Sequence, residues 1–124
     1  MQRIVVDALG RLPQFSHATV AGGLVFVSGT LGTLPGGFRL AEGGAGPETR
    51  QTLANIETIL AAAGATLRDV VKASVYLADM ADFGAMNAAW SERFPSDPPA
   101  RITVGGAQLA LGARVEIECI ASAP

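Results

Sequence analysis

The sequence has very few of the residues that build metal sites, disulfides and cationic surfaces. It contains one Cys and one His among 124 residues, so neither an intrachain disulfide nor a zinc site within one chain can form. Lys72 is the only lysine, and the net charge is −2. A dedicated nucleic-acid binder would carry a basic footprint that this chain lacks. We therefore expect no metal and no nucleic-acid partner.

Long apolar runs are also missing. No stretch approaches the roughly 18 apolar residues that a transmembrane helix needs. The apolar run near the N-terminus, Ile4–Val6, is too short for a signal peptide. We expect a cytoplasmic protein with no membrane partner.

Charge is scarce as well, because charged residues make up only 16% of the chain while hydrophobic residues make up 49%. The mean hydropathy is +0.35, which is too apolar for a disordered chain. A single domain over residues 1–124 is expected from the length. Small domains leave much of their surface exposed, and this chain is rather apolar for a small monomer. We explain the excess of apolar residues by the abundance of Ala and by surface that is buried against another chain.

Alternation of apolar and polar residues predicts a set of short strands. They are expected over Arg3–Val6, Ala18–Ala21, Leu24–Ser28, Val70–Leu77, Ile102–Val104 and Ala113–Ala121. The Gly22-Gly23 pair predicts a two-residue hairpin turn. Residues 29–46 are rich in glycine and predict a long loop, which is typical of functional or mobile segments.

Two helices complete the predicted elements. One opens at Pro47, a residue favoured at the first helical position, and ends at Gly64. The other runs from about Asp82 to Phe94 and stops before Pro95. The order β-β-β-α-β-α-β-β predicts an α+β fold, a two-layer sandwich with both helices on one face of a single sheet. The other sheet face then lacks a cover, and a homo-oligomer built through the sheets would supply one.

Arg101 and Glu116 are the main candidates for chemistry. Arg101 follows two prolines and opens a strand, so its guanidinium fork is held on a rigid edge where it can bind a carboxylate. The alternative is a surface salt bridge. Glu116 and Glu118 share one face of a strand and could divide acid and base roles, or they form only the solvated face of that strand.

Other candidates have weaker patterns. His17 lies in a loop, where it is either a proton shuttle or a solvent-exposed side chain. Cys119 is expected to be a buried hydrophobic residue rather than a reactive thiol. The segment Ser28–Gly32 ends a strand in a glycine-rich turn that could hold an anion through backbone amides.

Taken in order, several segments resemble the RidA/YjgF family of reactive-intermediate deaminases. The matching segments are Phe15–Ala18, Val25–Thr30, Thr49–Ile56, Asp69–Lys72, Leu77–Phe83, Met86-Asn87, Pro98–Arg101 and Val115–Glu118. The resemblance covers nearly the whole chain.

This resemblance implies a chorismate-mutase-like fold with one mixed sheet, and a homotrimer with clefts between subunits. It implies cofactor-free hydrolysis of 2-imino or 2-enamino acids to 2-keto acids and ammonia. Arg101 matches the arginine that binds the substrate carboxylate, and Glu116 matches the residue that positions water. The remaining implied contacts with substrate are Phe15, Ser28, Gly29, Asn87 and Thr103.

Several positions depart from the family pattern. The usual Gly-Pro-Tyr-Ser-Gln reads Pro13-Gln14-Phe15-Ser16-His17 here, so Phe15 replaces the tyrosine and His17 the glutamine, and Thr103 replaces a frequent cysteine. The preference for small imino acids therefore does not carry over directly. Two alternatives stay open on the same scaffold: a binding protein for keto or imino acids, and a pathway-specific hydrolase or tautomerase that uses His17.

Overall fold

The computed structural model describes residues 1–124, and its elements follow the predicted order. The strands are β1 (Gln2–Ile4), β2 (Ala18–Ala21), β3 (Leu24–Leu31), β4 (Val70–Leu77), β5 (Ala100–Val104) and β6 (Val115–Ser122). The helices are α1 (Ala45–Ala62) and α2 (Phe83–Arg93), with short 3₁₀ turns η1 (Leu67–Asp69), η2 (Met80–Asp82) and η3 (Ala110–Gly112). None of the helices has the length and apolar character to cross a membrane.

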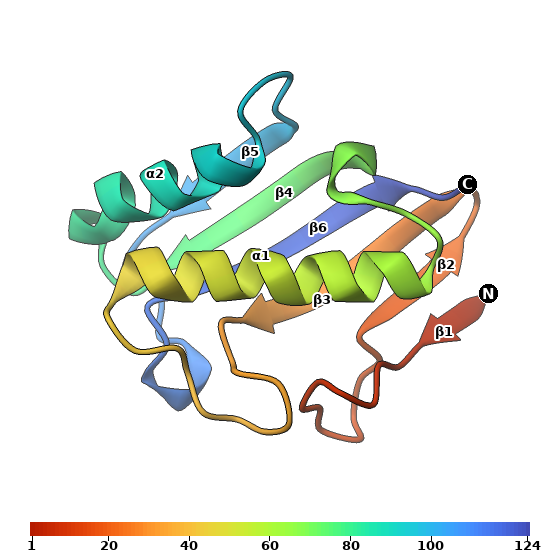
Figure 1. Ribbon diagram of the computed structural model, residues 1–124, viewed down its shortest axis with the longest axis horizontal. Helices are drawn as coiled ribbons and strands as arrows, with labels where there is room; N and C mark the ends of the chain where they lie inside the picture. Colours follow the sequence, from red (N-terminus) through yellow and green to blue (C-terminus); the bar gives the residue numbers. More distant parts are fainter.

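One six-stranded sheet forms the base of the fold. Its strand order is β1-β2-β3-β6-β4-β5, and only the β4–β5 pair is parallel. Figure 1 shows α1 and α2 lying across the same face of this sheet. The predicted two-layer α+β sandwich with a mixed sheet is therefore confirmed.

The core lies between the helices and the sheet. Helix α1 buries Leu53, Ile56, Ile59 and Leu60, whose spacing places them on one side of a helix. Met86 and Trp90 of α2 are buried beside them. Phe83, the first residue of α2, is 37% exposed.

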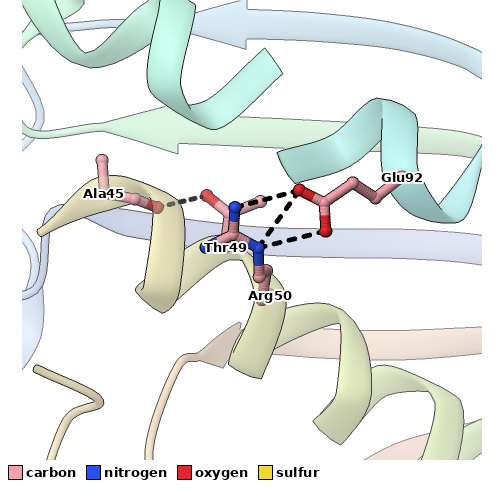
Figure 2. Close-up of polar contacts among 4 residues, drawn as sticks. All are labelled: Ala45, Thr49, Arg50 and Glu92. Atoms are coloured by element: carbon pink, nitrogen blue, oxygen red, sulfur yellow. Dashed lines mark hydrogen bonds and ion pairs between the residues drawn. The ribbon is translucent and has the colours of Figure 1, made fainter. Parts of the chain in front are cut away.

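A polar contact on the surface links the two helices. Figure 2 shows the guanidinium of Arg50 on α1 meeting the carboxylate of Glu92 on α2, with an Nη2–Oε2 distance of 2.9 Å. Beside it, the Thr49 hydroxyl donates to the carbonyl of Ala45 at 2.7 Å. The Arg50–Glu92 pair is exposed and adds little stability, so the packing of α2 beside α1 depends mainly on their buried apolar side chains.

The sheet face that points away from the helices carries half-exposed apolar side chains. Phe26 of β3 and both Ile102 and Val104 of β5 are exposed. Exposed apolar side chains on one face of a sheet are typical of an interface between chains. The homotrimer itself remains a prediction.

Several boundaries differ from those expected, each for a local reason. β1 ends at Ile4 rather than Val6, because the Val6 amide donates to the His17 ring and not to a strand. β3 continues to Leu31, beyond Ser28, because β6 supplies a partner for Thr30 and Leu31. β5 starts at Ala100 rather than Ile102, since Ala100 already pairs with Lys72.

The remaining corrections concern the ends of α1, α2 and β6. Helix α1 begins at Ala45 rather than Pro47, and the proline still lies in the first turn, where its missing N–H costs nothing. Helix α2 starts one residue later than expected, after η2, and ends at Arg93, while β6 spans Val115–Ser122. The Gly22-Gly23 turn is confirmed, with φ of 59° and 77°. Gly64 ends α1 as expected, with φ of 77°.

Candidate active site

The main cavity lies at the end of the sheet where β3 extends beyond β2. Its volume is about 710 Å³, within the roughly 300–1,000 Å³ that is typical of ligand pockets. The walls come from the segment 9–17, the end of β3, the loop after β3, η3 and Glu116 of β6. In Figure 1, the long loop after β3 lies below the sheet, between the red N-terminal segment and the unlabelled blue turn that is η3.

Glu116 points into this cavity from β6. It pairs with Leu31 of β3 and Tyr76 of β4. Burial raises the pKa of its carboxyl, and the nearby charge of Glu118 raises it further. Glu118 itself is exposed, so the two glutamates have different surroundings. A carboxyl with a raised pKa is better suited to exchanging protons near neutral pH.

Gly29 makes room for this carboxylate. The β3–β6 register shifts between Val27 and Thr30, so Ser28 and Gly29 bulge toward the cavity. A Cβ atom placed on Gly29 would lie 2.7 Å from Oε2 of Glu116, which is closer than real Cβ contacts. Glycine at this position therefore sets where the Glu116 carboxylate sits.

We expect Gly29→Ala to move the Glu116 carboxylate and lower kcat/KM by about 10- to 100-fold, since small misplacements in a site have effects of this size. Gly29 is not among the residues with positive φ, so alanine is compatible with its backbone and the fold should persist. Steady-state kinetics with a thermal unfolding curve would check both points. Gly84→Ala, where nothing lies within 4 Å of the added Cβ, is the control. Wild-type activity in Gly29→Ala would contradict the role of Gly29 in positioning the Glu116 carboxylate.

His17 is buried, so its interpretation as a solvent-exposed loop residue is wrong. The Val6 amide donates to Nδ1 at 2.9 Å, and Nε2 lies 3.2 Å from the carbonyl oxygen of Gly10. These contacts fit a neutral ring that carries its proton on Nε2 and donates it to Gly10. His17 thus holds the segment 6–10, one wall of the cavity, against the start of β2. A proton-shuttle role would require one of these bonds to break.

The other predicted cavity residues lie close by. Phe15 is 42% exposed and lines the cavity, as does Ser28. The Ser28 hydroxyl donates to the carbonyl of Ser16 at 2.6 Å. Phe15, His17, Ser28, Gly29 and Glu116 are therefore brought together by one chain.

Arg101 lies in a separate cluster, beneath α2. Its Nη2 donates to Oδ1 of Asn87 at 2.8 Å. Its guanidinium carbon is 4.9 Å from the ring centroid of Trp90 and 5.7 Å from that of Phe83. Aromatic faces and an amide oxygen orient the cation without neutralising it.

No carboxylate pairs with Arg101. The salt bridges of the chain are Arg50–Glu92, Arg93–Glu57 and Arg114–Asp82, so the surface salt bridge considered for Arg101 is absent. Burial lowers the pKa of Arg101, but a guanidinium stays charged in proteins. A half-buried cation with unused donors is suited to binding an external carboxylate.

Arg101 and Glu116 lie on opposite faces of the sheet. Arg101 pairs with Ala73 on β4, whereas Glu116 pairs with Tyr76 on the same strand. Positions 73 and 76 are an odd number of residues apart, so their side chains and those of their partners point in opposite directions. β4 also separates β5 from β6 in the sheet. One chain therefore places the candidate residues in two separate clusters, the second of which contains Arg101 and Asn87.

Thr103 belongs to the same side as Arg101. It follows two residues later on β5 and pairs with the buried Val75. β5 is an edge strand, so one side of its backbone has no strand partner in this chain. The Thr103 backbone is thus available beside Arg101 for a further contact.

Some cavity residues had no signal in the sequence. Leu9, Leu12, Phe38 and Leu111 all line it, although single apolar residues in loops carry no periodic pattern. Asn55 of α1 is buried and donates to the carbonyls of Leu31 and Thr33 at 3.1 Å and 2.8 Å. Its role is to hold the start of the glycine-rich loop.

No group of three or more His, Cys, Asp or Glu side chains is placed to hold a metal ion. Cys119 is buried. Burial, assisted by the charge of Glu118, raises the pKa of its thiol to about 12, which keeps the thiol protonated and unreactive.

A model of the protein family described as "Endoribonuclease L-PSP" matches residues 6–123. The chain belongs to this family, the RidA/YjgF family. "Reactive Intermediate Deaminase A, chloroplastic" of Arabidopsis thaliana is 42% identical over 90% of this chain, which spans only 59% of that protein. A protein of Capra hircus named "2-iminobutanoate/2-iminopropanoate deaminase" is 44% identical, over 86% of this chain and 78% of its own length.

Solved members of the family have the same fold. The crystal structure of RidA from Psychrobacter sp. PAMC 21119 matches with a TM-score of 0.92 and 36% identity. The match covers 98% of this chain and 99% of that one. The two-layer sandwich is therefore the fold of the RidA/YjgF family.

Proposed function

We propose that the protein hydrolyses reactive 2-imino and 2-enamino acids to 2-keto acids and ammonia without a cofactor. The observation that carries this proposal is Glu116, the one carboxyl group in the cavity, with a pKa raised by burial. The deaminase names of relatives that are 42% and 44% identical support it.

The chemistry needs one proton acceptor that can also return the proton. In its ionised form, Glu116 would take a proton from water while the water oxygen bonds to the carbon of the protonated imine. This step gives a carbinolamine and a neutral carboxyl. That carboxyl then protonates the amine nitrogen of the carbinolamine. The C–N bond breaks while the hydroxyl oxygen forms the C=O bond of the keto acid. The released ammonia takes up the hydroxyl proton and becomes ammonium. Acid–base assistance of this kind contributes about 10²–10⁴ in rate.

We further propose that the site is completed between two chains of a homotrimer. Arg101 and Asn87 of one copy, with the Thr103 backbone, would meet the cavity of a neighbour that holds Phe15, Ser28, Gly29 and Glu116. Two features support this: Arg101 and Glu116 face opposite sides of one sheet, and the sheet exposes Phe26, Ile102 and Val104. Arg101 would then fix the substrate carboxylate over the neighbour's Glu116.

The decisive assay generates imines in place with an amino-acid oxidase and traps them with semicarbazide. The protein is expected to remove the imine before it is trapped and to speed ammonia release. A small-metabolite binding protein would bind 2-keto acids in calorimetry and leave ammonia release unchanged. That result would replace the hydrolase with the binding alternative.

We expect the acid limb of the kcat/KM profile to lie above the ordinary Glu value of 4.5, since Glu116 must be ionised to accept a proton and its pKa is raised. Glu118→Gln removes a like charge, so it should lower the pKa of Glu116 and move the limb to lower pH. A pH series on both proteins measures this shift. Either the absence of an acid limb in the wild type or a limb that Glu118→Gln leaves unmoved would remove Glu116 from the mechanism.

Two other interpretations have less support. A tautomerase that uses His17 would need a free ring nitrogen, and both nitrogens contact the backbone. RNA cleavage, as in the name of the family model, would bring a phosphate toward the Glu116 carboxylate, which would repel it. The cytoplasmic location stays a prediction, as one relative is named chloroplastic.

A further inference from the structure

We propose that the cavity beside Glu116 binds the side chain of the substrate, and that the protein prefers imino acids with large apolar side chains to those with small ones. Phe38 and Leu111 would be the residues that determine this specificity. The inference rests on the proposed function, because it concerns the same site. It adds a substrate class to the reaction. It also assigns a role to two segments that the mechanism does not use, the loop that contains Phe38 and the η3 turn that contains Leu111.

The size of the cavity is the first argument. About 710 Å³ is well above the lower end of the range of ligand pockets, roughly 300 Å³, so the space that one chain offers before a neighbour closes it has room for more than a methyl or ethyl group. Half of the lining residues are hydrophobic. An apolar side chain that displaces water from such walls is stabilised in proportion to the area it buries.

The placement of exposed apolar side chains is the second argument. Leu12, Phe15, Phe38 and Leu111 are 56%, 42%, 49% and 54% exposed, and all of them line this one cavity. Large apolar side chains gathered around a concave site mark a binding surface. A bulky substrate side chain would shield all of them from water.

The polar groups of the cavity are largely occupied. The Thr30 hydroxyl donates to the carbonyl of Ser28 at 2.8 Å, and the side chains of His17, Ser28 and Asn55 also contact backbone atoms. A polar substrate side chain would lose its water and find few partners. The cavity therefore discriminates by apolar contact, with Glu116 left for the reacting nitrogen and water.

Leu111 has an unusual backbone. Its φ is 63°, in the left-handed region where residues other than glycine are strained. It is 54% exposed, so packing in the core does not account for a leucine there. Strain held at the edge of a cavity is typical of binding sites, and it places this side chain on the cavity wall.

Phe38 is held in place by contacts between two loops. The Gly36 amide donates to the carbonyl of Ala8 at 2.8 Å. A Cβ on Gly10 would lie 3.1 Å from the Phe38 ring and 2.6 Å from the carbonyl oxygen of Gly37. The glycine-rich loop thus packs directly on the segment that His17 anchors. Phe38 is a fixed wall of the cavity rather than a loosely attached side chain.

The test compares kcat/KM for imines generated from alanine and from leucine or phenylalanine, in the wild type and in two variants. The wild type should favour the bulky imines by at least about tenfold, since a few buried methylene groups have effects of this size. Phe38→Ala and Leu111→Gly should each lower the ratio of bulky to small by at least about fivefold. Leu111→Gly also relaxes the backbone, so loss of fold would not explain its result. Val5→Ala, half-exposed and outside the cavity, is the control and should leave the ratio unchanged.

Failure of this inference is distinguishable from failure of the proposed function. A wild type that hydrolyses the alanine-derived imine as well as the leucine-derived one would overturn the inference and keep the hydrolase. If no imine is hydrolysed, calorimetry that compares the affinities for 4-methyl-2-oxopentanoate and pyruvate still tests whether the cavity binds the side chain. Tighter binding of the bulky acid that is lost in Phe38→Ala supports the cavity assignment, and equal binding rejects it.

Discussion

Arg101→Ala is expected to lower kcat/KM by about 10²–10⁴ while the fold persists. Hydrogen bonds to charged groups contribute about 1.5–3 kcal/mol each, and the Arg101 fork can offer two of them to one carboxylate. Each 1.36 kcal/mol changes a rate by a factor of ten. Arg101 lies on the edge strand β5 and has no salt bridge within the chain, so its removal leaves no unpaired charge behind.

Trp90 offers a direct reporter for this substitution. It is the only tryptophan of the chain, and the Arg101 guanidinium lies 4.9 Å from its ring centroid. A 2-keto acid bound at Arg101 should change Trp90 fluorescence in the wild type and leave it unchanged in Arg101→Ala. Arg101→Lys keeps the charge but loses the fork, so it should recover part of the activity. Full activity of Arg101→Ala toward the alanine-derived imine would reject the carboxylate-binding role.

Much of the fold was predictable because it depends on local patterns. Helical spacing and strand alternation gave the order of the elements, and Gly22-Gly23 and Gly64 gave a turn and a helix end. The ends of strands were less predictable. β3 runs through Gly29 because β6 pairs with it from far along the chain, and no local pattern shows such a partner.

β5 shows where alternation misleads. Ile102 and Val104 are the apolar residues of this strand, so a simple pattern would point them toward the core. Instead they are exposed on the open face, and Arg101 points toward α2, where it contacts Asn87 and Trp90. This reversed polarity is explained if the open face is buried against another chain. A partner's contribution to burial cannot be read from the period of one strand.

The candidate site was predictable as a set of residues but not as an arrangement. Each member comes from a recognisable segment, yet the face on which a side chain lies depends on strand order and on the bulge at Ser28 and Gly29. His17 shows the same limit. It was expected in an exposed loop, but the segment from Val6 to Gly10 folds over it.

Mixing two inactive variants is expected to restore activity. Glu116→Gln keeps Arg101 and removes the proton acceptor, so it should lose about 10²–10⁴ in rate. Arg101→Ala keeps Glu116 and loses the carboxylate anchor. When the two are co-expressed and assort at random in a trimer, about a quarter of the clefts join an intact Arg101 to an intact Glu116. Those clefts should work at the wild-type rate.

This mixing experiment tests where the site lies, because one chain places Arg101 and Glu116 on opposite faces of its sheet. If the site lay within a single chain, mixing would restore nothing, since every copy lacks one of the groups. Mixing Arg101→Ala with the double variant is the control, because no cleft then holds both groups. Native mass spectrometry establishes that mixed trimers have formed. Recovery in the first mixture alone would place the chemistry between chains, whereas mixed trimers without recovery, or a fully active monomer, would place it elsewhere.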